Sequence, residues 1–230
     1  MRISGLQKFS MIDYNDKLCA VVFTQGCNFK CPYCHNPELV PMLRKDSLIS
    51  PEEVLEFLKG RVGKLDAVVI TGGEPLLQTK LIPFLEKVKA LGFLIKLDTN
   101  GLLYQTLEKV IASGLIDYIA MDIKTSLSDY DEVVQVKVEQ NSLLKSIKLI
   151  KNSGIDHEFR TTTVEGLISE ENIYDIGKNL IGKSNYYIQN FVKSHHLDDT
   201  YQNRIGFSPA KLERIISKLK QDGIKVELRN

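Results

Sequence analysis

The sequence predicts an α/β protein built on parallel strands, and three observations support this prediction. Short apolar runs rich in β-branched residues recur along the chain, and they are apolar on both faces, as buried parallel strands are. Amphipathic segments of helical period lie between them, and several end in glycine before the next run. Alternating strands and helices form right-handed parallel βαβ units. With about six units, we expect a partial, open TIM-like barrel rather than a closed eight-stranded one.

Six or seven strands are expected. The first four runs are strongly apolar and the last three are weaker; they cover 18–24, 66–71, 93–99, 116–123, 157–164, 185–191 and 224–229. Helices are expected at 51–61, 81–92, 103–114, 142–154, 170–180 and 208–223, the first with Ser50 as its cap. The polar segment 126–140 fits a helix or a loop. The longest stretch without an expected element, 36–49, is a candidate lid or partner surface.

Composition limits the possible functions. The 230 residues, with 43% hydrophobic and 26% charged, suffice for one globular domain spanning residues 1–230. A net charge of +1 does not indicate nucleic-acid binding. Neither a secretory signal nor a membrane-length apolar run is evident, so we expect a cytoplasmic protein with no membrane partner. Three of the four cysteines lie within eight positions, which in a cytoplasmic chain indicates metal or redox chemistry.

The cysteine cluster directly follows the first expected strand. Cys27, Cys31 and Cys34 have the spacing C-x-x-x-C-x-x-C, which lets one loop supply three thiolates to an iron–sulfur cluster. The fourth iron would then be open to a substrate. Cys19 lies within an apolar run and is better explained as a buried small side chain.

Three other sites could use the same residues. A zinc site usually needs a fourth ligand from a second pair, and His35 is awkwardly close to Cys34. The run from Cys31 to His35 fits C-x-x-C-H, but covalent haem attachment belongs with exported proteins. The Cys-Pro-Tyr-Cys segment also resembles the glutaredoxin motif, so a dithiol oxidoreductase is the strongest competitor. The third cysteine and the chain length favour the cluster.

The cysteine spacing, with aromatic Tyr33 before the last cysteine, resembles the signature of radical S-adenosylmethionine (SAM) enzymes. A second motif agrees: Gly72-Gly73-Glu74 ends the second apolar strand, as a similar motif does in that family. The resemblance implies one [4Fe–4S] cluster and SAM as cofactors. It also implies that the Gly72–Glu74 loop binds the methionine amino group, for which Glu74 supplies an acceptor.

Further site residues come from strand ends. In the activating enzymes of glycyl radical enzymes, segments similar to Asp98-Thr99-Asn100-Gly101 and Asp122-Ile123-Lys124 contact SAM or a cation. The resemblance therefore implies that Asp122 and Lys124 bind the amino acid part of SAM, and that Asp98 and Thr99 hold a monovalent cation. Arg160, on the fifth expected strand, could meet the SAM carboxylate or serve only structure. The roles of His195 and His196 stay open.

Within the family, the segment from Gly5 to Val40 most resembles activating proteins of anaerobic ribonucleoside-triphosphate reductase. Asn15-Asp16 stands where that subgroup has Pro-Gly. The resemblance implies reductive cleavage of SAM to a 5'-deoxyadenosyl radical, which installs a glycyl radical on a partner enzyme, with a separate electron donor. Two alternatives remain: a radical SAM enzyme acting on a small molecule, as in deazapurine biosynthesis, and the dithiol oxidoreductase.

Overall fold

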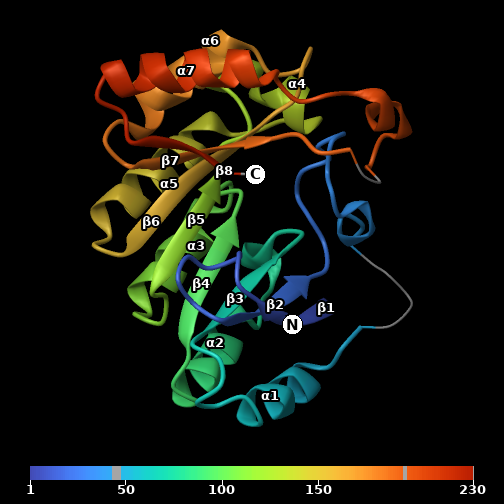
Figure 1. Ribbon diagram of the computed structural model, residues 1–230. Helices are drawn as coiled ribbons and strands as arrows, with labels where there is room; N and C mark the ends of the chain where they lie inside the picture. The colour runs from blue at the N-terminus through green and yellow to red at the C-terminus, as the bar shows by residue number, and fades with distance from the viewer. Residues whose placement is uncertain (43–47, 194–195, 230) are drawn as a thin grey trace. The chain divides into compact units, whose positions relative to one another are not determined.

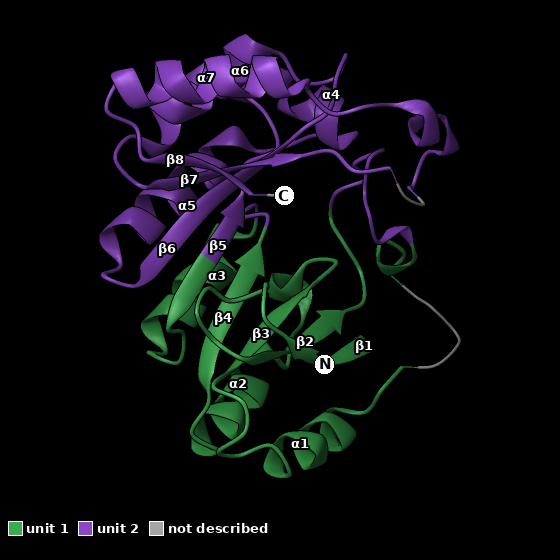
Figure 2. Ribbon diagram, viewed as in Figure 1, with its two compact units in different colours: residues 1–28, 38–99, 103–119 green, residues 29–37, 100–102, 120–230 purple. Residues whose placement is uncertain are grey.

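The computed structural model describes residues 1–42, 48–193 and 196–229 (Figure 1). The chain divides into two compact units, which Figure 2 colours separately. Unit 1 comprises residues 1–28, 38–99 and 103–119, and unit 2 comprises 29–37, 100–102 and 120–230. Two compact units can share one domain, so the assignment of residues 1–230 to a single domain stays a prediction.

Unit 1 is built on strands β1 (Ile3–Ser10), β2 (Cys19–Thr24), β3 (Ala67–Gly72) and β4 (Leu94–Thr99). Strands β2, β3 and β4 are parallel and follow chain order, whereas β1 pairs antiparallel with β2. All six residues of β2 pair with β3, from Cys19 opposite Ala67 to Thr24 opposite Gly72. Their carboxyl ends therefore lie level, at the edge of a parallel sheet where ligands usually bind.

The helices of unit 1 are α1 (Pro51–Lys59), α2 (Leu81–Ala90) and α3 (Tyr104–Ala112), with the short η2 (Pro75–Leu77). Ser50 caps α1 in a reciprocal capping box with Glu53, as its sequence predicts. Leu81, Phe84, Leu85 and Val88 form the buried face of α2 at helical spacing. The short η1 (Pro37–Leu39) begins in unit 2 and continues into unit 1.

Strand β5 (Tyr118–Asp122) begins in unit 1 and ends in unit 2. Unit 2 continues with β6 (Asp156–Thr163), β7 (Asn185–Asn190) and β8 (Val226–Arg229), which are parallel and in chain order. Its helices are η3 (Leu127–Asp129), α4 (Tyr130–Val134), α5 (Gln140–Asn152), α6 (Glu170–Asp175), the π-helix η4 (Ile176–Ile181), η5 (Asp199–Asn203) and α7 (Pro209–Gln221). Helices α6 and α7 lie side by side (Figure 1).

The predicted α/β class is confirmed, because parallel strands alternate with helices in both units and neither unit closes into a barrel in its described residues. All seven expected strands form. The sequence analysis missed β1, which brings the strands of the described residues to eight. Its residues are mostly polar or small, and only its pairing with β2 identifies it as a strand.

Two undecided segments are settled in part. The first half of segment 126–140 is helical, and α4 stops where Gln135 adopts a left-handed φ of 53°. Asp16, in the turn that replaces Pro-Gly, also has a left-handed φ of 57°, which aspartate tolerates better than most residues. Of the candidate lid at 36–49, residues 43–47 lie outside the described part of the chain.

No helix in the described residues is long and apolar enough to cross a membrane.

Candidate functional site

The loop after β2 carries the three clustered cysteines, and none of them forms a disulfide. The amide of Cys27 donates to the carbonyl of Val40 at 3.1 Å within unit 1. In unit 2, the amide of Cys34 donates to the carbonyl of Cys31 at 3.0 Å, which makes a tight turn between these two thiols. Cys31 is buried and the other two are half-buried. Three thiols on one loop, none in a disulfide, are the donor chemistry that an iron–sulfur cluster needs.

Cys27 belongs to unit 1, whereas Cys31 and Cys34 belong to unit 2. Across residues 1–42, 48–193 and 196–229, no three His, Cys, Asp or Glu side chains gather into a group that could hold a metal ion. The set of three thiolate ligands therefore stays a prediction. Cys19, in contrast, is fully buried in the core of unit 1, where burial above all raises the pKa of its thiol to about 11. It behaves as the small apolar side chain that the sequence predicted.

The paired glycines at the end of β3 are required by the neighbouring backbone. A Cβ on Gly72, whose φ is 117°, would lie 2.3 Å from the amide nitrogen of Thr24. One on Gly73 would lie 2.1 Å from the carbonyl oxygen of Gly26 and 2.9 Å from that of Leu39. The sequence analysis connected these glycines only with a loop that binds the methionine amino group. The structure adds a nearer cause, which is that β3 and the cysteine loop touch backbone to backbone.

Replacing Gly73 with alanine should lower the free energy of unfolding by about 3 kcal/mol, because two carbonyl groups cannot both move away from the new methyl. Chemical denaturation of the two proteins measures the difference. Gly60→Ala is the matched control, since Gly60 has an ordinary φ of −69° and its nearest contact would be 3.5 Å away. A Gly73→Ala protein as stable as the Gly60→Ala protein would contradict the steric argument.

Glu74 is fully buried directly after these glycines. Its Oε1 accepts hydrogen bonds from the amide of Leu76 at 3.0 Å and from the hydroxyl of Thr99 at 2.8 Å. Glu74 thereby caps η2 and joins the ends of β3 and β4. Its predicted contact with an ammonium group stays a prediction, and so does the contact of Thr99 with a cation.

Asp98 lies near the carboxyl end of β4, with its side chain 12% exposed. The ammonium of Lys96 lies 3.6 Å from its Oδ1. The sequence analysis did not single out Lys96, although a lysine within the apolar run 93–99 was a detectable signal. The following Asn100-Gly101 forms a turn, in which the Asn100 side chain accepts from the amide of Leu102 at 3.1 Å and Gly101 has a φ of 74°.

Three predicted SAM-binding residues of unit 2 form one charged group. The carboxylate of Asp122 accepts from Nζ of Lys124 at 3.0 Å and from Nε of Arg160 at 2.7 Å. Their side chains are 28%, 19% and 12% exposed, in that order. The structure thus brings together residues of β5, the turn after it and β6. The group carries a net positive charge, and so can attract a carboxylate.

The pKa values in this group reflect strong pairing. Burial alone would raise the pKa of Asp122, but the charges of Arg160 and Lys124 outweigh burial and hold it well below its usual value. Burial likewise disfavours the charged form of Lys124, yet Asp122, followed by Tyr33 and Cys31, raises its pKa well above the ordinary value. Tyr33 and the Cys31 thiol are therefore close enough to Lys124 to raise its pKa.

Two aromatic groups complete this part of unit 2. Tyr33 is buried, and its hydroxyl has no hydrogen-bond partner in the described residues. The ring of His35 lies 4.9 Å from that of His196 and 5.9 Å from that of Phe191. Burial, followed by the charges of His196 and Lys124, lowers the pKa of His35. His195 lies outside the described residues, so its role stays open.

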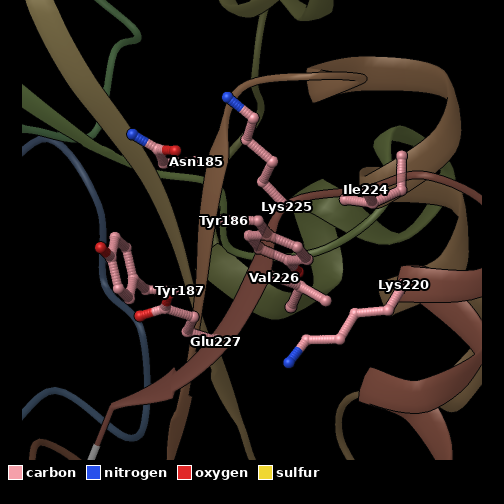
Figure 3. Close-up of a pocket in the computed structure, with 8 residues that line it drawn as sticks. All are labelled: Asn185, Tyr186, Tyr187, Lys220, Ile224, Lys225, Val226 and Glu227. Atoms are coloured by element: carbon pink, nitrogen blue, oxygen red, sulfur yellow. The ribbon is translucent and has the colours of Figure 1, made fainter.

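A separate hollow of about 330 Å³ lies at the amino-terminal ends of β7 and β8 (Figure 3). Asn185, Tyr186 and Tyr187 line it from β7, and Lys220 lines it from α7. None of the predicted ligand residues lines it. This hollow therefore does not belong to the candidate site.

Comparison with protein families gives one match over most of the chain. Residues 21–178 match the model described as "Radical SAM superfamily". The matched range begins within β2 and includes the cysteine loop, the paired glycines, Asp122, Lys124 and Arg160.

Three curated relatives cover large parts of the chain. A protein of Methanocaldococcus jannaschii, named as a candidate glycyl-radical enzyme activating enzyme, is 38% identical over 87% of this chain and 84% of its own length. A pyruvate formate-lyase-activating enzyme of Clostridium pasteurianum is 30% identical over 75% of this chain and 73% of its own. A GTP 3',8-cyclase of Campylobacter lari is 28% identical over 90% of this chain, which spans 63% of that enzyme.

Solved structures show the same fold. A radical SAM methyltransferase of Sphaerobacter thermophilus matches 94% of the chain with a TM-score of 0.73 and 14% identity, over 67% of its own chain. SuiB of Streptococcus suis, solved with S-adenosylmethionine bound, matches 90% of the chain with a TM-score of 0.68 and 17% identity. The present chain spans 48% of SuiB, about half of its length.

Proposed function

Because the chain belongs to the radical SAM superfamily, we propose that it activates a glycyl radical enzyme, specifically an anaerobic ribonucleotide reductase. The superfamily works with a [4Fe–4S] cluster and SAM, and the chain is an enzyme of this kind. The relative named for glycyl-radical activation, 38% identical over 84% of its own length, is the observation that supports the activating role. The family match also favours radical chemistry over the dithiol oxidoreductase.

Cys27, Cys31 and Cys34 would hold the cluster through their thiolates, leaving one iron for SAM. When bound and reduced, the cluster supplies the electron that cleaves SAM to methionine and a 5'-deoxyadenosyl radical. The tight turn between Cys31 and Cys34 presents both thiols from one short segment. The Gly72-Gly73 backbone packs against the base of the same loop at Gly26 and so fixes its starting point in unit 1.

The charged group in unit 2 would bind the amino acid end of SAM. Lys124 and Arg160 supply positive charge for its carboxylate, and Asp122 keeps both cations in place by accepting from each. Nε of Arg160 is engaged with Asp122, and its Nη1 lies 3.9 Å from Oε1 of the buried Glu158, so two carboxylates fix the orientation in which the guanidinium would meet the ligand. In unit 1, Glu74, already joined to Thr99 by a hydrogen bond, would accept from the SAM ammonium.

The resemblance implies a monovalent cation beside Asp98 and Thr99, but a lysine of the protein already lies next to Asp98. The Lys96 ammonium lies 3.6 Å from the Asp98 carboxylate and already provides one positive charge there. We further propose that the partner is a separate reductase and that a separate reductant supplies the electron.

Two measurements test the proposed function. The anaerobically reconstituted protein, with a chemical reductant and SAM, should release 5'-deoxyadenosine. Electron paramagnetic resonance of the anaerobic reductase, after incubation with the same mixture, should then show a glycyl radical. Absence of 5'-deoxyadenosine would refute the radical chemistry, and its release without a glycyl radical would refute only the choice of partner.

A second candidate, cleavage of SAM to act on a purine nucleotide, is favoured by the similarity to GTP 3',8-cyclases. The chain spans only 63% of the Campylobacter lari cyclase, less than it spans of the Methanocaldococcus relative. Incubating the reconstituted enzyme with SAM and GTP distinguishes the two functions. GTP consumption that keeps pace with 5'-deoxyadenosine release would favour the nucleotide reaction.

A further inference from the structure

Lys96 is a lysine with its whole side chain inside the protein. It lies on β4, two residues before Asp98, so the two side chains point to the same face of the strand. Lys96 is only 3% exposed. An ammonium group is rarely buried this completely unless negative or polar groups surround it.

Three groups of unit 1 surround the Lys96 ammonium. It donates a hydrogen bond to the backbone carbonyl of Asp13 at 2.5 Å, in the loop between β1 and β2. It lies 3.6 Å from Oδ1 of Asp98 and 5.6 Å from the centre of the Tyr118 ring. The carbonyl and the ring hold the ammonium in place without cancelling its charge, while Asp98 is the carboxylate it pairs with.

This arrangement affects what else can bind at Asp98. A mobile monovalent ion beside that carboxylate would lie close to a fixed ammonium and be repelled by it, in a partly buried setting where charges interact strongly. The hydroxyl of Thr99, the other expected cation ligand, donates a hydrogen bond to Glu74. Thr99 is thus hydrogen-bonded to Glu74, whereas Asp98 Oδ1 pairs with Lys96 through its charge, at a distance longer than a hydrogen bond.

We propose that Lys96 is a positioning residue whose ammonium takes the place of an exchangeable monovalent cation beside Asp98. The inference rests on the proposed function in one respect, because Asp98 matters to SAM only if SAM binds at this end of β4. It differs from the cation expectation of the sequence analysis, since the charge beside Asp98 is built into β4.

The test compares the potassium dependence of SAM binding in the wild type, Lys96→Met and Lys89→Met. Methionine keeps the unbranched apolar stem, ends one atom short of the lysine ammonium and removes its charge. Lys89 is the matched control, because it also lies in unit 1 and is paired with an aspartate, Asp117, at 2.6 Å. SAM affinity of the reconstituted proteins is measured by anaerobic equilibrium dialysis, in about 100 mM choline chloride or potassium chloride so that ionic strength stays constant.

Wild type and Lys89→Met should change in SAM affinity by less than about two-fold between the two salts. Lys96→Met should bind SAM about ten-fold more weakly in choline and recover to within about three-fold of wild type in potassium. A purely structural lysine would not produce this rescue by potassium. A wild type that gains about ten-fold in affinity from potassium, or a Lys96→Met protein that potassium does not restore, would overturn the proposal.

A second readout needs neither the cluster nor SAM. Potassium should raise the melting temperature of cluster-free Lys96→Met above its value in choline and leave that of the wild type unchanged, because only the variant has an empty cation position. A potassium-dependent rise in the wild type would overturn the proposal, even if Lys96→Met does not fold. A wild type that cleaves no SAM refutes the proposed function instead, so the two failures are distinguishable.

Discussion

Replacing Cys31 with serine should reduce the iron bound after anaerobic reconstitution to below about a tenth of the wild-type amount and slow SAM cleavage about a thousand-fold. Serine retains the size and the local turn, in which the Cys31 carbonyl accepts from the Cys34 amide. It removes the thiolate, which is the ligand that iron in such clusters prefers. Iron analysis and 5'-deoxyadenosine release measure the two effects.

Cys19→Ser is the matched control, because it makes the same chemical change in the fully buried core of unit 1. It should lower stability, since a hydroxyl replaces a buried thiol, yet leave the iron content per folded protein unchanged. Equal iron content in Cys31→Ser and Cys19→Ser would show that Cys31 is not a ligand. A loss of iron in both would show that the assay reports unfolding.

The second large effect is expected for Asp122→Ala, which should lower the free energy of unfolding by about 2 kcal/mol. Asp122 accepts from both Lys124 and Arg160, and removing it leaves two neighbouring cations facing each other. All three side chains are partly screened by solvent, which keeps the loss below that of a fully buried pair. Urea denaturation of the cluster-free protein measures the change.

An exposed ion pair provides the comparison. Glu56 and Lys59 lie 3.0 Å apart on α1 with side chains 76% and 60% exposed, so Glu56→Ala should change stability by less than about 0.5 kcal/mol. Combining Asp122→Ala with Arg160→Met should recover part of the loss, because one of the two like charges that Asp122 bridged is then gone. If Asp122→Ala unfolded at the same urea concentration as Glu56→Ala, the group formed by Asp122, Lys124 and Arg160 would not contribute to the stability of the protein.

The sequence by itself determined most of the strands and helices and the residues that could serve the chemistry. Four strongly apolar runs and three weaker ones predicted six or seven strands, and all seven candidates form. The cysteine spacing and the paired glycines predicted the family that residues 21–178 match. These signals are local, since the period of a strand or helix and the spacing of ligands on one loop are both written in consecutive residues.

Only the tertiary structure decided which side chains contact one another and which charged groups form pairs. It showed that the Gly72-Gly73 pair is pressed against Thr24 and Gly26, and that Asp122 is held between Lys124 and Arg160. It also showed that Lys96, an unremarked lysine in an apolar run, lies beside Asp98. Each of these depends on segments far apart in the chain or on the direction of a buried side chain. Neither is encoded in local periodicity, because packing and the need to pair buried charges act only once the strands have come together.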